Sequence, residues 1–157
     1  MFITPSDIAD ALATMVASEF PGETIYRELM ETDFSRPCTM IVQESCTGDV
    51  DVGSNIVELR PTFTLTTFVK VDPYHNSHLA DLHLRQMHLV GMFLAGFIRV
   101  KDRGPKVHGV EMGGGYDYDT VTVTFRYALD RSDFMNIPQL PVMEELHTNK
   151  EEVETHG

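Results

Sequence analysis

The sequence predicts an α+β fold: a mixed, mainly antiparallel sheet of four to six strands with two helices packed on one face. Two segments, 5–19 and 76–95, carry apolar residues at helical spacing, and residues 120–127 alternate strictly between apolar and polar. After residue 131 the pattern changes to scattered apolar residues among prolines, which predicts an extended C-terminal arm. We therefore expect one α+β domain over residues 1–130 and an arm with an acidic end over residues 131–157.

The first helix is expected to run from about Pro5 to Glu19. Thr4 suits the N-cap, Pro5 suits the first helical position, and Asp7 completes an approximate capping box. Pro21-Gly22 ends the helix. One face of this helix is expected to be buried, because five apolar residues share it: Ile8, Ala11, Leu12, Met15 and Val16.

Strands are expected around residues 25–28 and 38–42, separated by a turn at 34–37. Pro37 lacks a backbone donor, so it belongs at the first residue of the second of these strands. Residues 47–55 are rich in Gly, Asp and Asn, which indicates a hairpin tip. A long strand follows over 56–69, and Pro61 within it implies a bulge or an edge position.

The second helix is expected over residues 76–95, with Asn76 or Ser77 as its cap. The stripe expected to cover the sheet contains Leu79, Leu82, Leu89, Val90, Phe93, Leu94 and Phe97. The opposite side is also apolar, which predicts contact with the first helix, with a neighbouring subunit, or with both. The candidate interface residues on this side are Leu84, Met87, His88 and Met92.

The remaining elements are a short strand over 97–100, a strand over 106–112, a Gly-rich hairpin turn over 113–119 and the alternating strand over 120–127. The arm carries scattered apolar residues, and Phe134, Ile137 and Leu140 are its candidate interface residues. Past Glu144 the arm has one Lys against further Glu residues, which predicts a solvated end.

The formal net charge is −12, from 24 acidic and 12 basic residues. This balance argues against a surface that grips nucleic acid, because phosphate neutralisation needs clustered Lys and Arg. No apolar run is long enough to predict a transmembrane helix, and the N-terminus has no basic region before an apolar stretch. Cys38 and Cys46 would lie roughly 26 Å apart on one strand, so we expect two buried, reduced thiols.

The residue patterns do not favour an enzyme, a metal site or a cofactor site. His78, His83 and His88 follow one another at intervals of five residues, whereas helical metal ligands need intervals of three or four. The glycines at 113–115 are not followed by the Lys-Ser/Thr and helix of a phosphate loop. Residues 49–55 lack the glutamate of a calcium loop, and Cys38 is expected to be packed and inert.

One segment resembles a known family. Ile25-Tyr26-Arg27-Glu28, after a helix that ends in Phe20-Pro21, and the turn Phe34-Ser35-Arg36-Pro37-Cys38 resemble the small tail-terminator proteins of phages and prophages. The resemblance extends over about residues 5–130. It implies a virion protein without catalytic residues, located in the neck region of the tail and in the host cytoplasm during assembly.

The resemblance also implies the partners. The protein would form a homohexameric ring on the last ring of tail-tube protein, end tube polymerisation and present the surface that meets head-completion, neck or sheath proteins. DNA would pass through the lumen without specific binding, which the acidic composition suits, and no membrane would be involved. The alternatives are a head-completion or neck connector protein of the same particle, or a small intracellular ligand-binding domain or enzyme.

Overall fold

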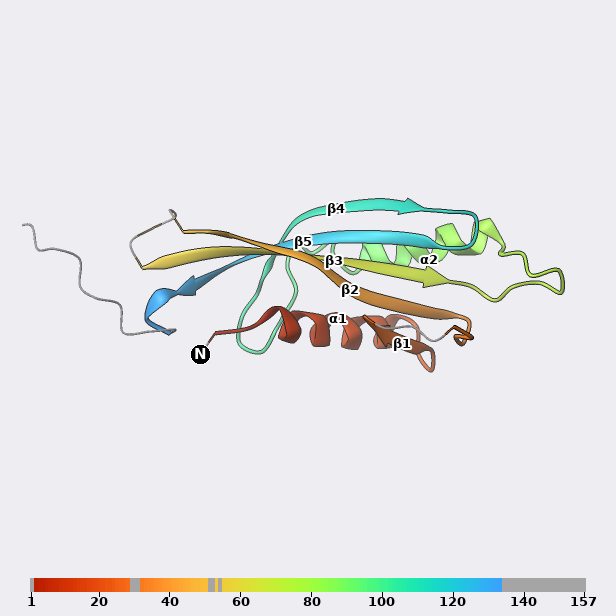
Figure 1. Ribbon diagram of the computed structural model, residues 1–157, viewed down its shortest axis with the longest axis horizontal. Coiled ribbons are helices and arrows are strands. Elements are labelled where there is room, and N and C mark those ends of the chain that lie inside the picture. Colours follow the sequence, from red (N-terminus) through yellow and green to blue (C-terminus); the bar gives the residue numbers. More distant parts are fainter. Residues whose placement is uncertain (1, 29–31, 51–52, 54, 134–157) are drawn as a thin grey trace, which may run out of the picture.

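A computed structural model describes residues 2–28, 32–50, 53 and 55–133 (Figure 1). The described residues form two α-helices and five strands, and the last of them form a 3-10 helix. In chain order the elements are α1 (Pro5–Glu19), β1 (Thr24–Arg27), β2 (Cys38–Asp49), β3 (Ile56–Phe68), α2 (Leu79–Gly91), β4 (Lys106–Gly114), β5 (Asp119–Asp130) and η1 (Arg131–Asp133).

The five strands form one sheet in the order β1-β2-β3-β5-β4. β1 pairs with β2 in parallel, and every other pair is antiparallel. The predicted α+β class with a mixed, mainly antiparallel sheet is confirmed. Of the arm predicted over residues 131–157, Arg131–Asp133 form the 3-10 helix η1 instead of extended chain, and residues 134–157 lie outside the described residues.

Both helices cover the same face of the sheet. Alternate residues of β5, from Val121 to Leu129, are buried in one core together with Leu12 of α1 and Leu89 of α2. Figure 1 shows α1 lying along β2, and α2 near the end of the sheet where β4 turns into β5. Apolar burial of this kind is the main favourable contribution to folding.

The other face of the sheet is rich in threonine. Thr62 of β3 and Thr124 of β5 share a hydrogen bond of 2.9 Å, and Thr64 and Thr122 share one of 3.3 Å. Such cross-strand pairs stabilise an antiparallel ladder. These threonines are half-buried by their neighbours in the sheet, and neither helix packs on this face.

The first helix has the predicted bounds and the predicted cap. The Thr4 hydroxyl accepts a hydrogen bond from the Asp7 backbone N–H at 3.2 Å, and an Asp7 carboxylate oxygen accepts one from the Thr4 N–H at 2.8 Å. Gly22, with φ of 79°, follows the helix and has the left-handed backbone that glycine adopts without strain. The short range of these contacts explains why the sequence predicts this helix correctly.

Pro61 lies in β3, the central strand, so the edge alternative is wrong; a bulge is present nearby, but it lies on the neighbouring strand β2. The register of β2 with β3 shifts between Gln43 and Ser45, close to the position opposite Pro61. Arg60 and Pro61 have no pairing partner on β5, although the register of β3 with β5 is the same before and after them. Since proline has no N–H, the ladder is interrupted where that donor would be needed.

Two further boundaries differ from the sequence prediction. β2 continues to Asp49, so residues 47–49 belong to a strand and the predicted hairpin tip over 47–55 is too long. Residues 97–100 form only isolated bridges, at Phe97 and Val100, and not the predicted strand. In both places the backbone pairing partner, which the local sequence does not identify, decides the structure.

The second helix is shorter than predicted and starts later. Its N-cap is His78, which makes no side-chain capping hydrogen bond, whereas Ser77 is engaged elsewhere. After Gly91 the chain continues in turns and not in α-helix. Leu79, Leu94 and Phe97 are exposed, so their predicted place on the sheet-covering stripe is wrong. In the described part of the chain, neither helix is long and apolar enough to cross a membrane.

Candidate functional site

Helix α2 is held to the sheet by one side. Leu82 and Leu89 are fully buried, and Gln86 is nearly so. The Gln86 amide donates hydrogen bonds to the carbonyl oxygens of Gly113 at 2.7 Å and Thr120 at 2.9 Å. The orientation of α2 is therefore fixed by both apolar packing and a buried amide, and its other side is directed away from the sheet.

The outward side of α2 carries the candidate interaction surface. A shallow hollow of about 400 Å³ is lined by six residues, among them all four candidate interface residues of this helix: Glu19, Leu84, Met87, His88, Gly91 and Met92. Leu84 is 60% exposed and Met87 is 54% exposed. We call Leu84, Met87 and Met92 the α2 apolar surface.

Exposed apolar side chains that lie together indicate a contact with another molecule. Leu94, which is 80% exposed, follows Gly91 by three residues and lies beyond the end of the helix. The sequence assigned Leu94 to the sheet-covering stripe, because continued helical spacing would place it there. The turns after Gly91 change its direction.

His88 joins the two helices at the edge of this surface. Its Nδ1 lies 2.8 Å from a Glu19 carboxylate oxygen at the end of α1, and its ring meets the Phe20 ring edge-on, with centroids 6.2 Å apart. The predicted contact between the two helices is therefore present. Phe134, Ile137 and Leu140, the other candidate interface residues, lie outside the described residues.

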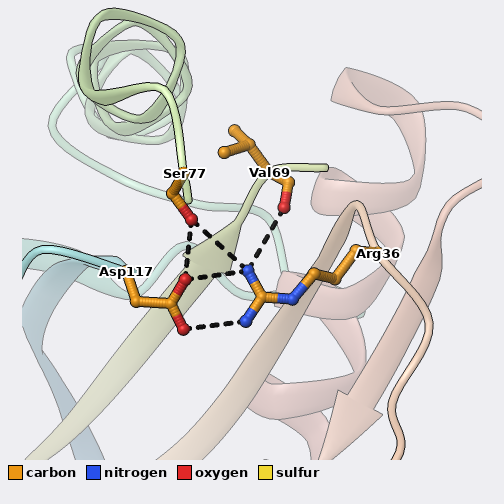
Figure 2. A network of polar contacts seen from close by, with 4 residues as sticks. All are labelled: Arg36, Val69, Ser77 and Asp117. Carbon is orange, nitrogen blue, oxygen red and sulfur yellow. Dashed lines mark hydrogen bonds and ion pairs between the residues drawn. The ribbon is translucent and has the colours of Figure 1, made fainter. Parts of the chain in front are cut away.

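A second set of contacts, the Arg36 network, lies at the end of the sheet near α2. Figure 2 shows Arg36 with Asp117, Ser77 and the Val69 carbonyl. The guanidinium donates two hydrogen bonds to the Asp117 carboxylate, at 3.0 and 2.8 Å, and one to the Val69 carbonyl at 3.3 Å. The Ser77 hydroxyl donates to the same carboxylate at 2.6 Å. Paired hydrogen bonds of this geometry fix both position and orientation.

Aromatic rings surround the Arg36 guanidinium. It lies 4.8 Å from the centroid of the Phe34 ring and 5.2 Å from that of the Phe68 ring. These two rings contact each other, and the Phe68 ring also meets the Tyr118 ring. The hydrogen bonds from Arg36 and then those from Ser77 hold the pKa of Asp117 below its ordinary value.

The network gives a structural role to the motif that carried the family resemblance. Phe34 and Arg36 belong to that motif, and the peptide bond between Arg36 and Pro37 is cis. The partner of Arg36 could not be identified from local sequence, because Asp117 lies 81 residues away from Arg36. A lone aspartate in a Gly- and Tyr-rich turn has no local pattern that identifies an ion pair.

The histidines of α2 and its N-cap are distributed over three separate acidic partners. His78 lies 3.3 Å from Asp81, and His83 lies 2.8 Å from Asp119, whereas His88 pairs with Glu19. Within the described ranges, no group of three or more His, Cys, Asp or Glu residues could hold a metal ion. The five-residue intervals direct the rings to different neighbours.

The pair of His83 with the buried Asp119 resembles part of a catalytic dyad. A hollow of about 340 Å³ beside it is lined by His83, Gln86, Met112, Gly113, Gly114, Gly115 and Asp119. These lining residues include no hydroxyl or thiol that could act as a nucleophile. Beside this pair, both donor contacts of the Gln86 amide go to backbone carbonyls, which connects α2 to β4 and β5.

Both cysteines are free, as predicted. Cys38 is buried, and burial raises the pKa of its thiol to about 11, which leaves it protonated and weakly nucleophilic near neutral pH. Cys46 is exposed, so its predicted burial is wrong. Both lie on β2, whose outer half, from Gln43 onward, is exposed.

Comparison with known proteins leaves the chain without an assigned family. No protein-family model matches the sequence, and no curated protein has significant similarity to it.

Proposed function

We propose that the protein is a structural virion protein of a phage tail: a terminator that assembles as a homohexameric ring on the end of the tail tube. The observation that carries the proposal is the α2 apolar surface. Leu84 and Met87 are exposed on a helix whose opposite side is firmly packed. An exposed apolar surface on a helix of fixed orientation suits a contact between subunits.

The resemblance of residues 25–38 to tail-terminator proteins supports the same proposal. The described part of this stretch includes most of β1, which pairs with β2, as well as Arg36 and the first residue of β2, Cys38. In the proposed ring, one surface contacts the tail-tube protein and another contacts head-completion, neck or sheath proteins. DNA passes through the lumen, where an acidic subunit of net charge −12 repels it.

The first experiment measures assembly directly. Native mass spectrometry and negative-stain microscopy of the full chain at increasing concentration are expected to reveal a closed ring. The protein is then added to polymerising tail-tube subunits of the same particle, where rings are expected at tube ends and tube growth is expected to stop. A protein that remains monomeric at high concentration and leaves tube growth unchanged would contradict the proposal.

The same experiment separates the terminator from a neck connector protein. Only a terminator is expected to limit tube length when it is added during polymerisation. A connector is expected to bind tubes that are already terminated, and to leave the growth of bare tubes unaffected.

A further inference from the structure

Positive charge gathers in one part of this acidic molecule. Arg99, Lys101 and Arg103 lie between α2 and β4, Lys106 begins β4, and Arg126 lies on β5. They line two hollows, of about 540 and 260 Å³, which share residues 102–104. Five of the twelve basic residues of the chain are therefore close together.

The larger hollow, which we call the cationic groove, has unneutralised positive charge. It is lined by Arg103, Lys106 and Arg126 as well as by Glu58 and Asp102. Glu58 is already paired with Arg60 at 2.9 Å. Lys106 and Arg126 are exposed, and within the described part of the chain no carboxylate lies within ion-pair distance of either.

Small residues also line the groove. Gly104, Pro105 and Ala128 line it beside the cations, and Arg103 donates a hydrogen bond to the Ala128 carbonyl at 3.0 Å. This hydrogen bond holds the 102–105 loop against β5, so the groove is a fixed feature. Its shape and charge suit an extended acidic peptide segment.

The chain itself contains such a segment. Residues 144–154 include Glu144, Glu145, Glu151, Glu152 and Glu154 with one basic residue, Lys150. Glu144 follows Asp133, the last described residue, by eleven positions, so an extended connection could span about 36 Å. Arg126 precedes Asp133 by seven positions, four along β5 and three in η1, which corresponds to at most about 19 Å. The acidic segment can therefore reach back to the groove of its own chain.

We propose that the cationic groove binds residues 144–154 of the same chain. A connection of this length gives an effective concentration on the order of millimolar, which favours the chain's own segment over that of a free neighbour. The contact is electrostatic and weakens with salt, because Lys106 and Arg126 are exposed to screening ions. The proposal does not depend on ring formation.

The test uses zero-length carbodiimide cross-linking of the full chain, which joins a lysine amine to a carboxylate in contact with it. Peptide mass spectrometry is expected to detect links from Lys106 to the glutamates of 144–154, with a yield that falls about fivefold between about 50 mM and about 500 mM NaCl. Lys70, which is exposed on another part of the molecule, serves as the internal control and is expected to give no such links.

A variant and an isotope experiment complete the test. Arg126→Gln is expected to reduce the Lys106 links severalfold without a change in thermal stability, whereas Arg27→Gln, which affects a cation outside the groove, is expected to leave them unchanged. In an equal mixture of unlabelled and ¹⁵N-labelled protein, the links are expected within one isotopic form. Links between the two isotopic forms would mean that the groove binds the acidic segment of a neighbouring copy. Equal yields of links from Lys70 and Lys106 would mean that the segment does not prefer the groove. Either result would overturn the proposal.

Discussion

Arg36 connects three segments that are distant in the chain. Its side chain is 19% exposed and joins Asp117 and the residues before α2. We expect Arg36→Met to lower the free energy of unfolding by about 2–3 kcal/mol, because the half-buried Asp117 carboxylate loses its charged partner. Urea denaturation measures the change.

The matched control is Arg27→Met. Arg27 pairs with Asp10 at 2.8 Å, but the Asp10 side chain is 69% exposed. An exposed pair of this kind contributes less than about 1 kcal/mol, so the variant should differ little from the wild type. Equal losses for the two variants would mean that the Arg36 network has no special structural role.

The pH dependence of stability provides a second test of the same residue pair. The pKa of Asp117 is lowered in the folded protein, chiefly by its hydrogen bonds from Arg36. A lowered folded-state pKa gives stability that is fully present above the ordinary value of 3.8 and is lost as the pH falls through the lowered value. We therefore expect the wild type to lose more stability than Asp117→Asn on acidification below about pH 4.

Thermal denaturation from pH 5 downward, followed for both proteins, measures this difference. The pKa of Asp7 is also lowered, mainly by the backbone hydrogen bond from Thr4, but it acts in both proteins and cancels. Parallel acid profiles for the two proteins would contradict the assignment to Asp117.

Distance along the chain decided which residues could be predicted. The Thr4–Asp7 cap spans three residues, and its pattern is visible in the sequence. The Arg36–Asp117 pair spans 81 residues, and no rule of local spacing finds it. The exposure of Cys46 was missed for a similar reason, because it depends on which part of β2 the helices cover.

The turn between β4 and β5 depends on a close approach at Gly114. A Cβ at Gly114 would lie 2.8 Å from the Tyr118 carbonyl oxygen and even nearer to the Asp119 carboxylate. We expect Gly114→Ala to destabilise the protein by about 1–3 kcal/mol, because backbone must move to relieve this contact. Gly109→Ala is the control on the same strand, since a Cβ there meets nothing within 4 Å. Equal stability of the two variants in urea would contradict the prediction.

The two sides of α2 should respond differently to substitution. Leu84→Asp and Met87→Asp are expected to change the free energy of unfolding by only about 0.5 kcal/mol, because both side chains are largely exposed. Both variants should nevertheless reduce self-association, which sedimentation velocity across a concentration series measures. Leu89→Ala, on the buried side, should cost about 2–5 kcal/mol of stability.

Tyr74→Asp tests whether any exposed apolar residue would give the same result. Tyr74 is 83% exposed but lies in the loop before α2. The Tyr74→Asp variant should leave self-association unchanged. Loss of association in this variant, or its retention in Leu84→Asp, would remove the α2 apolar surface from the proposed subunit contact.

Periodicity predicted the elements well where one physical pattern dominated. β5 alternates between buried and exposed residues as expected, and α1 has the expected bounds. The predicted start of α2 was wrong because the hydroxyl of Ser77, a good capping residue, donates a hydrogen bond to Asp117 and does not cap the helix. The edge position proposed for Pro61 was wrong, because the sequence cannot tell an edge strand from a central strand whose neighbour contains a bulge.

At the scale of the whole molecule, the fold class was predictable and the strand order was not. Two amphipathic helices and a set of alternating strands require a layer of helices on one face of a sheet. The order β1-β2-β3-β5-β4 and the parallel pairing of β1 depend on long-range contacts that no segment encodes alone. The candidate residues of α2 were predicted as a group because they share one helix, whereas the cationic groove joins separate elements and was missed.

The Arg36 network also bears on the rates of folding and unfolding. Its residues lie before β2, after β3 and between β4 and β5, so they meet only when those strands are already side by side. Contacts that close last are absent from the transition state, and their loss accelerates unfolding while folding proceeds at its normal speed. We therefore expect the network to slow unfolding and so to lengthen the lifetime of the native subunit.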